Sequence, residues 1–214
     1  MSVAQTWAIS TATIWQRRAD GGTGDGTAPR RRVWLCYIYC TMLRRRPPII
    51  VDIEASGFGT GSYPIEIGVV LSDGRKYCSL IAPAPGWTHW DEDAERVHCV
   101  SRDLLEAYGK PALEVARSLN ELLPQQTAYS DGWVVDKTWL DQLYFAAGIP
   151  SAFSLSALEM ILSEPQMEIW HTTKDELLRE LGQRRHRASF DAYVVQETWE
   201  RTWRATSARK VSAR

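Results

Sequence analysis

The sequence contains few cysteines and no long uninterrupted hydrophobic run. Its four cysteines, among 214 residues, lack the paired short spacing of a structural zinc site, and no disulfide framework is suggested. We therefore expect reduced thiols and a cytoplasmic protein. The longest apolar run, Val33 to Leu43, falls well short of the roughly 20 residues that span a bilayer. No membrane partner is expected.

An excess of one charge is also missing, since the formal net charge is −1. This near-neutral total conceals basic ends, residues 1–46 and 184–214, and a strongly acidic middle, residues 47–183. The pattern fits a metal-binding body with arginine-rich edges that can meet phosphate. A solvated surface with two polar tails explains the charges equally well.

The chain divides by composition into three segments. Residues 1–46 contain arginine clusters and a glycine-rich stretch without sustained periodicity, so we predict a disordered basic extension. A nucleic-acid-binding arm is the alternative for this segment. Residues 47–204 have the pattern of a folded domain, and residues 205–214 are predicted to be a flexible tail. The hydrophobic content of 44% is ordinary for a globular protein.

Apolar periodicity predicts strands first and alternating helices and strands afterwards. Three strands in a row, with a turn at residues 72–74, suggest an antiparallel meander. This order is typical of an α/β fold, a mixed sheet covered by helices. The predicted strands are 49–53, 65–71, 75–82, 127–130 and, weakly, 152–155; the predicted helices are 101–108, 111–123, 134–147, 156–162, 174–181 and 187–203.

Two carboxylates at the end of the first strand are the most informative feature. Asp52 and Glu54 follow an apolar β-branched run, and residues two apart in a strand point to the same face. Like charges held this close repel each other unless a cation lies between them. The pair therefore predicts a metal site.

Three residues far downstream are candidates for the same site. Asp136 shares a helix face with Trp139, Leu140 and Leu143, so it should point at the sheet. Taken alone, favourable interaction with the helix dipole explains this residue better.

His186 and Asp191 lie five residues apart, so we place His186 in the loop before the last helix and Asp191 in its first turns. Asp191 leans inward with Val194 and Val195, which is unfavourable for a charge without a partner or a metal. His186 alone, in a basic run, would more often be a surface residue.

Together these residues resemble the motifs of the DEDDh family of 3′-to-5′ exonucleases, which includes ribonuclease T and the proofreading subunits of DNA polymerase III. The resemblance covers roughly residues 49–200 and rests on segments 52–58, 136–140 and 186–192. A secondary likeness lies at 94–101, where Cys99 replaces a glycine common in the family. Ala55, Ser56 and the segment 129–131 also depart from the family pattern.

The resemblance implies a ribonuclease H-like fold with a mixed five-stranded sheet flanked by helices. It implies two divalent cations, Mg²⁺ or Mn²⁺, with Asp52 bridging them, Glu54 and Asp191 on one and Asp136 supporting the other. His186 would be the general base, and Gly57, Phe58 and His98 would contact the substrate.

The expected activity is stepwise hydrolysis at the 3′ end of single-stranded DNA or RNA, with release of nucleoside 5′-monophosphates. Many relatives form dimers, so a homodimer is possible. The alternatives are a non-catalytic nucleic-acid-binding or adaptor protein on the same fold and an endonuclease of the wider ribonuclease H-like group.

Overall fold

The computed structural model describes residues 46–182 and 186–212. The first three strands are β1 (Ile49–Ala55), β2 (Pro64–Val70) and β3 (Lys76–Leu80), and they form the predicted antiparallel meander. Strands β4 (Thr127–Ser130) and β5 (Ser154–Ala157) then add to the other edge of β1 in parallel. The resulting mixed sheet has five strands in the order β3-β2-β1-β4-β5.

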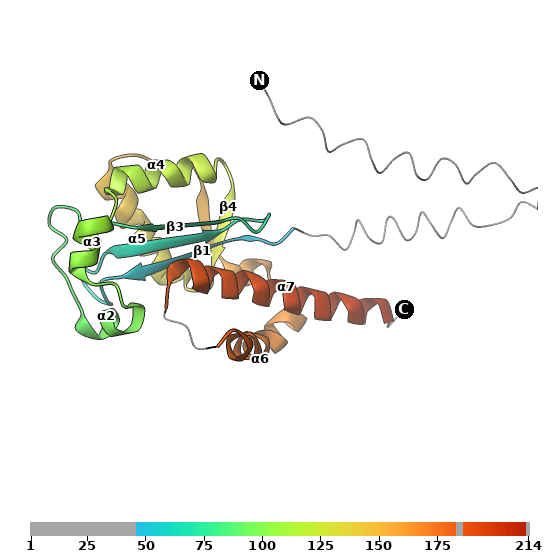
Figure 1. The fold of residues 1–214 in the computed structure, drawn as a ribbon. Coiled ribbons are helices and arrows are strands. Elements are labelled where there is room, and N and C mark those ends of the chain that lie inside the picture. The colour runs from blue at the N-terminus through green and yellow to red at the C-terminus, as the bar shows by residue number, and fades with distance from the viewer. Residues whose placement is uncertain (1–45, 183–185, 213–214) are drawn as a thin grey trace, which may run out of the picture. The chain divides into compact units, whose positions relative to one another are not determined.

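Helices cover both faces of this sheet (Figure 1). Helices α4 (Ala112–Leu122) and α5 (Trp133–Ala147) pack on the face where Val51 and Ile53 are buried. Helix α7 (Ala188–Ser212) packs on the opposite face, where Ile50 is buried against Trp199. Because side chains alternate along a strand, Asp52 and Glu54 lie on the α7 face with Ile50.

The remaining helices are shorter or lie beside α7. Helices α2 (Glu92–His98) and α3 (Arg102–Tyr108) follow β3, and a 3₁₀ turn, η2 (Leu158–Ile161), follows β5. Helix α6 (Glu164–Leu181) packs against α7. None of the helices in the described ranges is both long and apolar enough to cross a membrane.

The observed elements correct several predicted bounds. Helix α2 was not predicted, and α6 starts ten residues before the predicted helix 174–181. The start of α6 has local signals that explain it, because Ser163 N–H donates to Gln166 Oε1 and a proline occupies the first turn. The first two residues of the predicted helix 156–162 belong to β5 instead, and Leu158–Ile161 form the 3₁₀ turn.

The division into segments 1–46, 47–204 and 205–214 stays a prediction. Residues before Arg46 lie outside the described part of the chain. Helix α7 continues beyond its predicted end near residue 203 and ends at Ser212.

Candidate active site

Strand β1 presents two carboxylates on the face of the sheet that α7 covers. Asp52 and Glu54 are half-buried, and the residues between and beside them, Val51, Ile53 and Ala55, are buried on the other face. The strand is therefore fixed in register by its apolar side, which forces both acids to the α7 side. This is the arrangement that the sequence predicts.

Helix α7 brings a third carboxylate to the same point because β2 allows a close approach. Gly68, the register partner of Asp52, lies under the start of the helix, and a Cβ there would be 2.2 Å from Ala188 C and Ser189 N. Only glycine leaves room for backbone at this distance. The first turn of α7 therefore lies directly on the sheet, and Asp191 projects toward Asp52.

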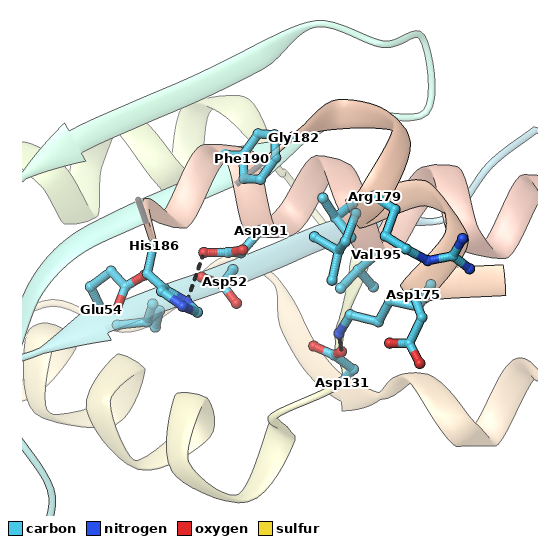
Figure 2. A pocket seen from close by; sticks show the side chains of 14 residues that line it. Asp52, Glu54, Asp131, Asp175, Arg179, Gly182, His186, Phe190, Asp191 and Val195 are labelled. Atoms are coloured by element: carbon cyan, nitrogen blue, oxygen red, sulfur yellow. Dashed lines mark hydrogen bonds and ion pairs between the residues drawn. The ribbon is translucent and has the colours of Figure 1, made fainter. Parts of the chain in front are cut away.

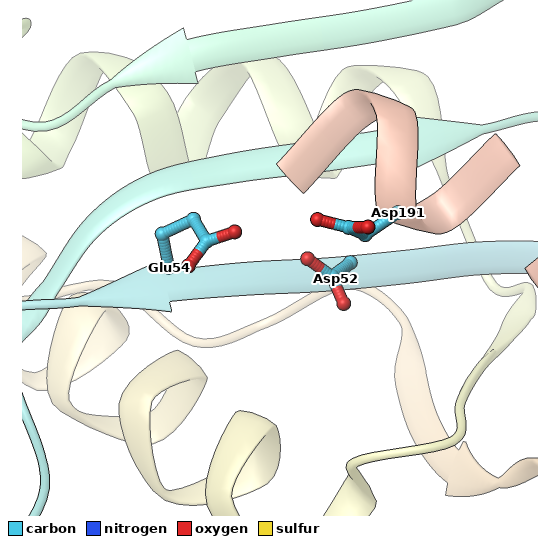
Figure 3. A group of neighbouring side chains, drawn as sticks. All are labelled: Asp52, Glu54 and Asp191. Atoms are coloured by element: carbon cyan, nitrogen blue, oxygen red, sulfur yellow. The ribbon is translucent and has the colours of Figure 1, made fainter. Parts of the chain in front are cut away.

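Asp52, Glu54 and Asp191 form a compact group of carboxylates, drawn in Figure 3. One oxygen of each lies within 4.8 Å of one oxygen of both others. The backbone N–H of Arg187 donates to Asp191 Oδ2 at 3.1 Å, which fixes that side chain from the start of the helix. Asp52 and Glu54 have no hydrogen bond or ion pair from any described side chain.

The group is electrostatically unfavourable without a cation. Burial, followed by the nearby Asp136 and Glu54 charges, raises the pKa of Asp52 well above its ordinary value. Burial and the Asp191 charge raise the pKa of Glu54 to about 7, and burial also raises that of Asp191. Hard carboxylate oxygens at this spacing are the donors that Mg²⁺ and Mn²⁺ prefer, so the residues present fit such ions.

Asp136 lies beside this group but outside it. It is 3% exposed in the first turn of α5, and its carboxylate accepts a hydrogen bond from the Ser130 hydroxyl. Burial raises its pKa to about 7 despite that hydrogen bond. The sequence prediction that Asp136 points at the sheet is consistent with this burial, and Ser130 is a partner that the sequence did not reveal.

His186 lies at the rim of the site, before α7 begins. Its Nδ1 is 3.8 Å from Asp191 Oδ2, and its side chain is 63% exposed. The imidazole is therefore open to solvent on one side and faces a carboxylate on the other. The loop position predicted for it is confirmed, since α7 starts two residues later.

Two cavities meet at these residues, and Asp52, Ile53, Glu54 and His186 line both. The smaller has a volume of about 460 Å³ and also contains Gly57, Phe58, His98 and Asp136 in its wall. The larger, about 1070 Å³, lies between β1, α6 and α7 (Figure 2). The carboxylates thus stand on the boundary between a small and a large space.

The wall of the smaller cavity contains the three residues predicted to contact substrate. Gly57 has a φ of 134°, and a Cβ there would be 2.5 Å from Asp91 Cβ, so the turn after β1 requires glycine. The ring of Phe58 is 73% exposed and lies 5.8 Å from that of Trp139. An aromatic surface at the mouth of the cavity results.

His98 is, like Asp136, a buried polar residue of this cavity, at 2% exposure. Its Nδ1 accepts a hydrogen bond from Val100 N–H at 3.1 Å, and burial lowers its pKa. The neutral ring therefore holds its proton on Nε2. Nε2 has no hydrogen-bond partner among the described residues. Cys99, where a glycine would be expected, has a φ of 57° and ends α2.

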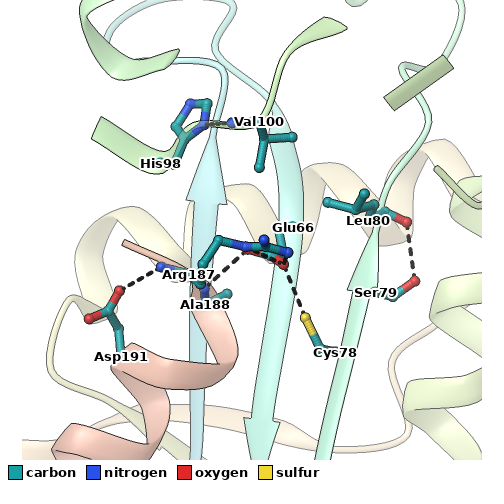
Figure 4. A network of polar contacts seen from close by, with 9 residues as sticks. All are labelled: Glu66, Cys78, Ser79, Leu80, His98, Val100, Arg187, Ala188 and Asp191. Atoms are coloured by element: carbon teal, nitrogen blue, oxygen red, sulfur yellow. Dashed lines mark hydrogen bonds and ion pairs between the residues drawn. The ribbon is translucent and has the colours of Figure 1, made fainter. Parts of the chain in front are cut away.

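A further acidic residue on this face, Glu66, is paired with a cation, as Figure 4 shows. Glu66 of β2 is 0% exposed and accepts hydrogen bonds from the Arg187 guanidinium at 2.6, 2.9 and 3.1 Å. Ala188 N–H and Cys78 Sγ also donate to it. Arg187 belongs to the basic run that contains His186, and its guanidinium is held against Glu66. Arg184 and Arg185 of the same run lie outside the described residues.

Sequence comparisons give no relatives: no family model matches the chain, and a search of curated proteins finds no match. Solved structures do match. Exonuclease I from E. coli in complex with a dA16 oligonucleotide has a TM-score of 0.55 and 11% identity over 73% of this chain and 40% of the other. Exonuclease I from Methylocaldum szegediense has a TM-score of 0.56 and 11% identity over the same shares.

These matches establish the fold alone. The chain has a ribonuclease H-like α/β architecture, with a mixed five-stranded sheet flanked by helices, as predicted. It spans less than half the length of these neighbours.

Proposed function

We propose that this protein is a metal-dependent 3′-to-5′ exonuclease of the DEDDh type, hydrolysing the terminal phosphodiester of single-stranded DNA or RNA. The observation that carries the proposal is the convergence of Asp52, Glu54 and Asp191, of which Asp52 and Glu54 form no ion pair with any described side chain. A buried acidic group of this kind is unfavourable in an apoprotein, which makes a structural role a poor explanation. The oligonucleotide in the exonuclease I structure supports a single-stranded ligand.

The metal ligands would be the three converging carboxylates and Asp136. Two divalent cations held there would lower the pKa of a bound water and neutralise charge developing on the phosphate. Asp52, between the other acids, is the proposed shared ligand, with Glu54 and Asp191 on one side. Asp136, outside the compact group, would help to hold the other ion.

His186 is the proposed general base. Its rim position lets it reach solvent and substrate together, and Asp191 close to Nδ1 would stabilise the protonated ring. The proton of the attacking water would pass to Nε2. The products would be a nucleoside 5′-monophosphate and a strand shorter by one nucleotide.

The smaller cavity is the proposed seat of the 3′-terminal nucleoside. Phe58 would stack on the base, and the backbone at Gly57 would approach the sugar. His98 would donate from Nε2 to an acceptor on the nucleotide, which would satisfy an otherwise unpaired buried group. A His98→Ala variant should then raise KM about tenfold, the effect of losing one hydrogen bond, and change kcat less.

The proposal is tested with end-labelled DNA and RNA oligonucleotides in Mg²⁺ or Mn²⁺. The protein should shorten a 5′-labelled strand one nucleotide at a time, and Asp52→Ala should abolish this while circular dichroism shows an unchanged fold. Asp73→Ala, an exposed acid paired with Arg75, is the matched control and should keep full activity. Persistent degradation by Asp52→Ala would overturn the proposal.

The same assay separates the alternatives. Binding without cleavage in the presence of metal would indicate an adaptor, and cleavage of a circular single strand would indicate an endonuclease. A homodimer and a cytoplasmic location stay predictions.

A further inference from the structure

One face of α6 lines the larger cavity and faces the carboxylates. The spacing of its lining residues, at i, i+1, i+4, i+5 and i+8, is that of a single helical face. The residues are Lys174, Asp175, Leu178 and Arg179 of the helix and Gly182, which directly follows its last residue. In Figure 2, Asp175 and Arg179 lie on one side of the cavity and Asp52, Glu54 and Asp191 on the other.

Two basic side chains, those of Lys174 and Arg179, lie on this face of α6. Lys174 Nζ is 2.6 Å from Asp131 Oδ2 in the loop after β4, and the two side chains are 30% and 28% exposed. Arg179 is exposed and forms no ion pair with any residue in the described part of the chain. Both cations border a cavity whose other walls are mainly acidic or apolar. A polyanionic strand leaving the carboxylates through this cavity would meet them first.

The two cavities differ in size and lining, and this difference indicates which of them would hold the 3′ end of a bound nucleic acid. The smaller is lined by the apolar side chains Phe58, Trp139 and Val97 and suits one nucleoside, whereas the larger has more than twice the volume and is also lined by Lys174 and Arg179. The scissile phosphate must lie at the carboxylates, where the cavities meet. A terminal nucleoside in the smaller cavity therefore leaves only the larger one for the rest of the strand.

We infer that the larger cavity binds the nucleotides on the 5′ side of the scissile phosphate, and that Lys174 and Arg179 contact their backbone phosphates. This inference rests on the proposed function and adds to it a substrate-binding site on α6. Lys174 exchanges Asp131 for a phosphate oxygen when the strand binds. The partner is single-stranded nucleic acid, because the contacts are to phosphates and leave base identity unread.

The test compares two substrates that differ in what they place in the larger cavity. An oligonucleotide supplies upstream phosphates, whereas the p-nitrophenyl ester of thymidine 5′-monophosphate carries a single phosphate and no upstream strand. Lys174→Ala should lower the ratio of kcat/KM on the oligonucleotide to that on the ester about tenfold, the effect of one charged hydrogen bond partly offset by the existing Asp131 pair. Arg179→Ala should lower this ratio less, because the residue is more exposed.

Salt dependence gives a second readout that a purely structural lysine would not change. Loss of one phosphate contact should reduce the slope of log affinity against log salt by about 0.7 for a single strand. Fluorescence anisotropy with a labelled oligonucleotide measures this slope, with Lys174→Ala introduced into an Asp52→Asn background to prevent cleavage. Lys174→Arg should restore both the ratio and the slope.

The control is Lys110→Ala, which removes a lysine that pairs with Glu114 and lines neither cavity. It should leave the ratio and the slope unchanged. If the wild-type protein hydrolyses both substrates and Lys174→Ala changes both equally, or neither, the α6 site is wrong while the proposed function stands. If the wild-type protein hydrolyses neither substrate, the proposed function fails.

Discussion

Glu54 and Glu66 are directly opposite each other on neighbouring strands and have opposite environments. They are register partners in the β1–β2 pair, so both side chains lie on the α7 face. Burial would raise the pKa of Glu66, but hydrogen bonds from Arg187 and Cys78 lower it below its ordinary value. Burial and Asp191 raise the pKa of Glu54 to about 7.

The different environments of the two glutamates indicate a structural role for Glu66 and fit the functional role proposed for Glu54. Glu66 is the more buried, yet it is paired with the guanidinium of Arg187, just before α7, and accepts a further hydrogen bond from Cys78 of β3. Glu54 is given no donor, although Arg187 is close enough to influence it. Under the proposed function, the unpaired Glu54 is the carboxylate that would bind a cation. The Glu66 pair also holds the start of α7, and thus Asp191, in place.

The largest predicted effect is the loss of activity when Glu54, the unpaired glutamate, is substituted. Glu54→Gln should lower kcat/KM on an oligonucleotide about 10³-fold, because losing metal-centred charge stabilisation is worth several kcal/mol. Its melting temperature in EDTA should stay the same or rise, since an unpaired charge is removed. Glu106→Gln, an exposed glutamate of α3, should change neither value. A fully active Glu54→Gln protein would contradict the functional role proposed for Glu54.

Breaking the Glu66–Arg187 pair should have the opposite effect, lowering the stability of the protein more than its catalytic activity. Arg187→Met leaves Glu66 buried without its cation, which should lower the free energy of unfolding by about 2–3 kcal/mol, less than a fully buried pair because Arg187 is partly exposed. Urea unfolding at pH 7.5 measures this. Adding Glu66→Gln should recover part of the loss. A double variant no more stable than the single one would show that the pair is not the cause.

Much of this arrangement could be predicted from local sequence pattern. Alternation along β1 placed Asp52 and Glu54 on one face, and helical spacing placed Asp191 inward. Strand β4 has the bounds predicted for it. Helix α2 and the start of α6 were missed because their sequences are mostly polar, so apolar periodicity is weak there and only capping signals mark the ends.

The Glu66–Arg187 pair could not be found in this way. The two residues are 121 positions apart, and each has a plausible alternative explanation, an edge-facing acid and an exposed arginine. Glu66 lies between Ile65 and Ile67 in a fully buried strand, and a charge in such a run was the available signal. Its pairing with Arg187 depends on where the start of α7 packs on the sheet, and the local sequence pattern does not specify this position.

Substitution of Gly68 tests whether the position of α7 on the sheet determines the position of Asp191 in the carboxylate group. Gly68→Ala places a Cβ 2.2 Å from the backbone of Ala188 and Ser189, so the helix must shift. Such overpacking should lower stability by about 1–3 kcal/mol and should weaken Mn²⁺ binding, because Asp191 moves away from Asp52. Thermal melts with and without Mn²⁺ measure both effects. Gly68→Ser should be affected more strongly, and tight Mn²⁺ binding by either variant would contradict this account.

The smallest effect concerns the protons that the unpaired carboxylates hold. With a pKa of about 7, Glu54 and Asp136 are each partly protonated at pH 7 in the metal-free protein, and a cation must displace those protons. Mn²⁺ binding at pH 7 should therefore release about half a proton from each, and affinity should fall as the pH falls from 8 to 6.

Because both folded-state pKa values are raised above the unfolded ones, the associated stability is present below pH 4 and is lost as the pH rises through 7. The metal-free protein should accordingly melt at a lower temperature at pH 8 than at pH 5.5. Calorimetric titration of Mn²⁺ in buffers of different ionisation enthalpy counts the released protons, and Glu54→Gln should release fewer. Binding without proton release would mean that Glu54 is already ionised, and the contrast with Glu66 would then disappear.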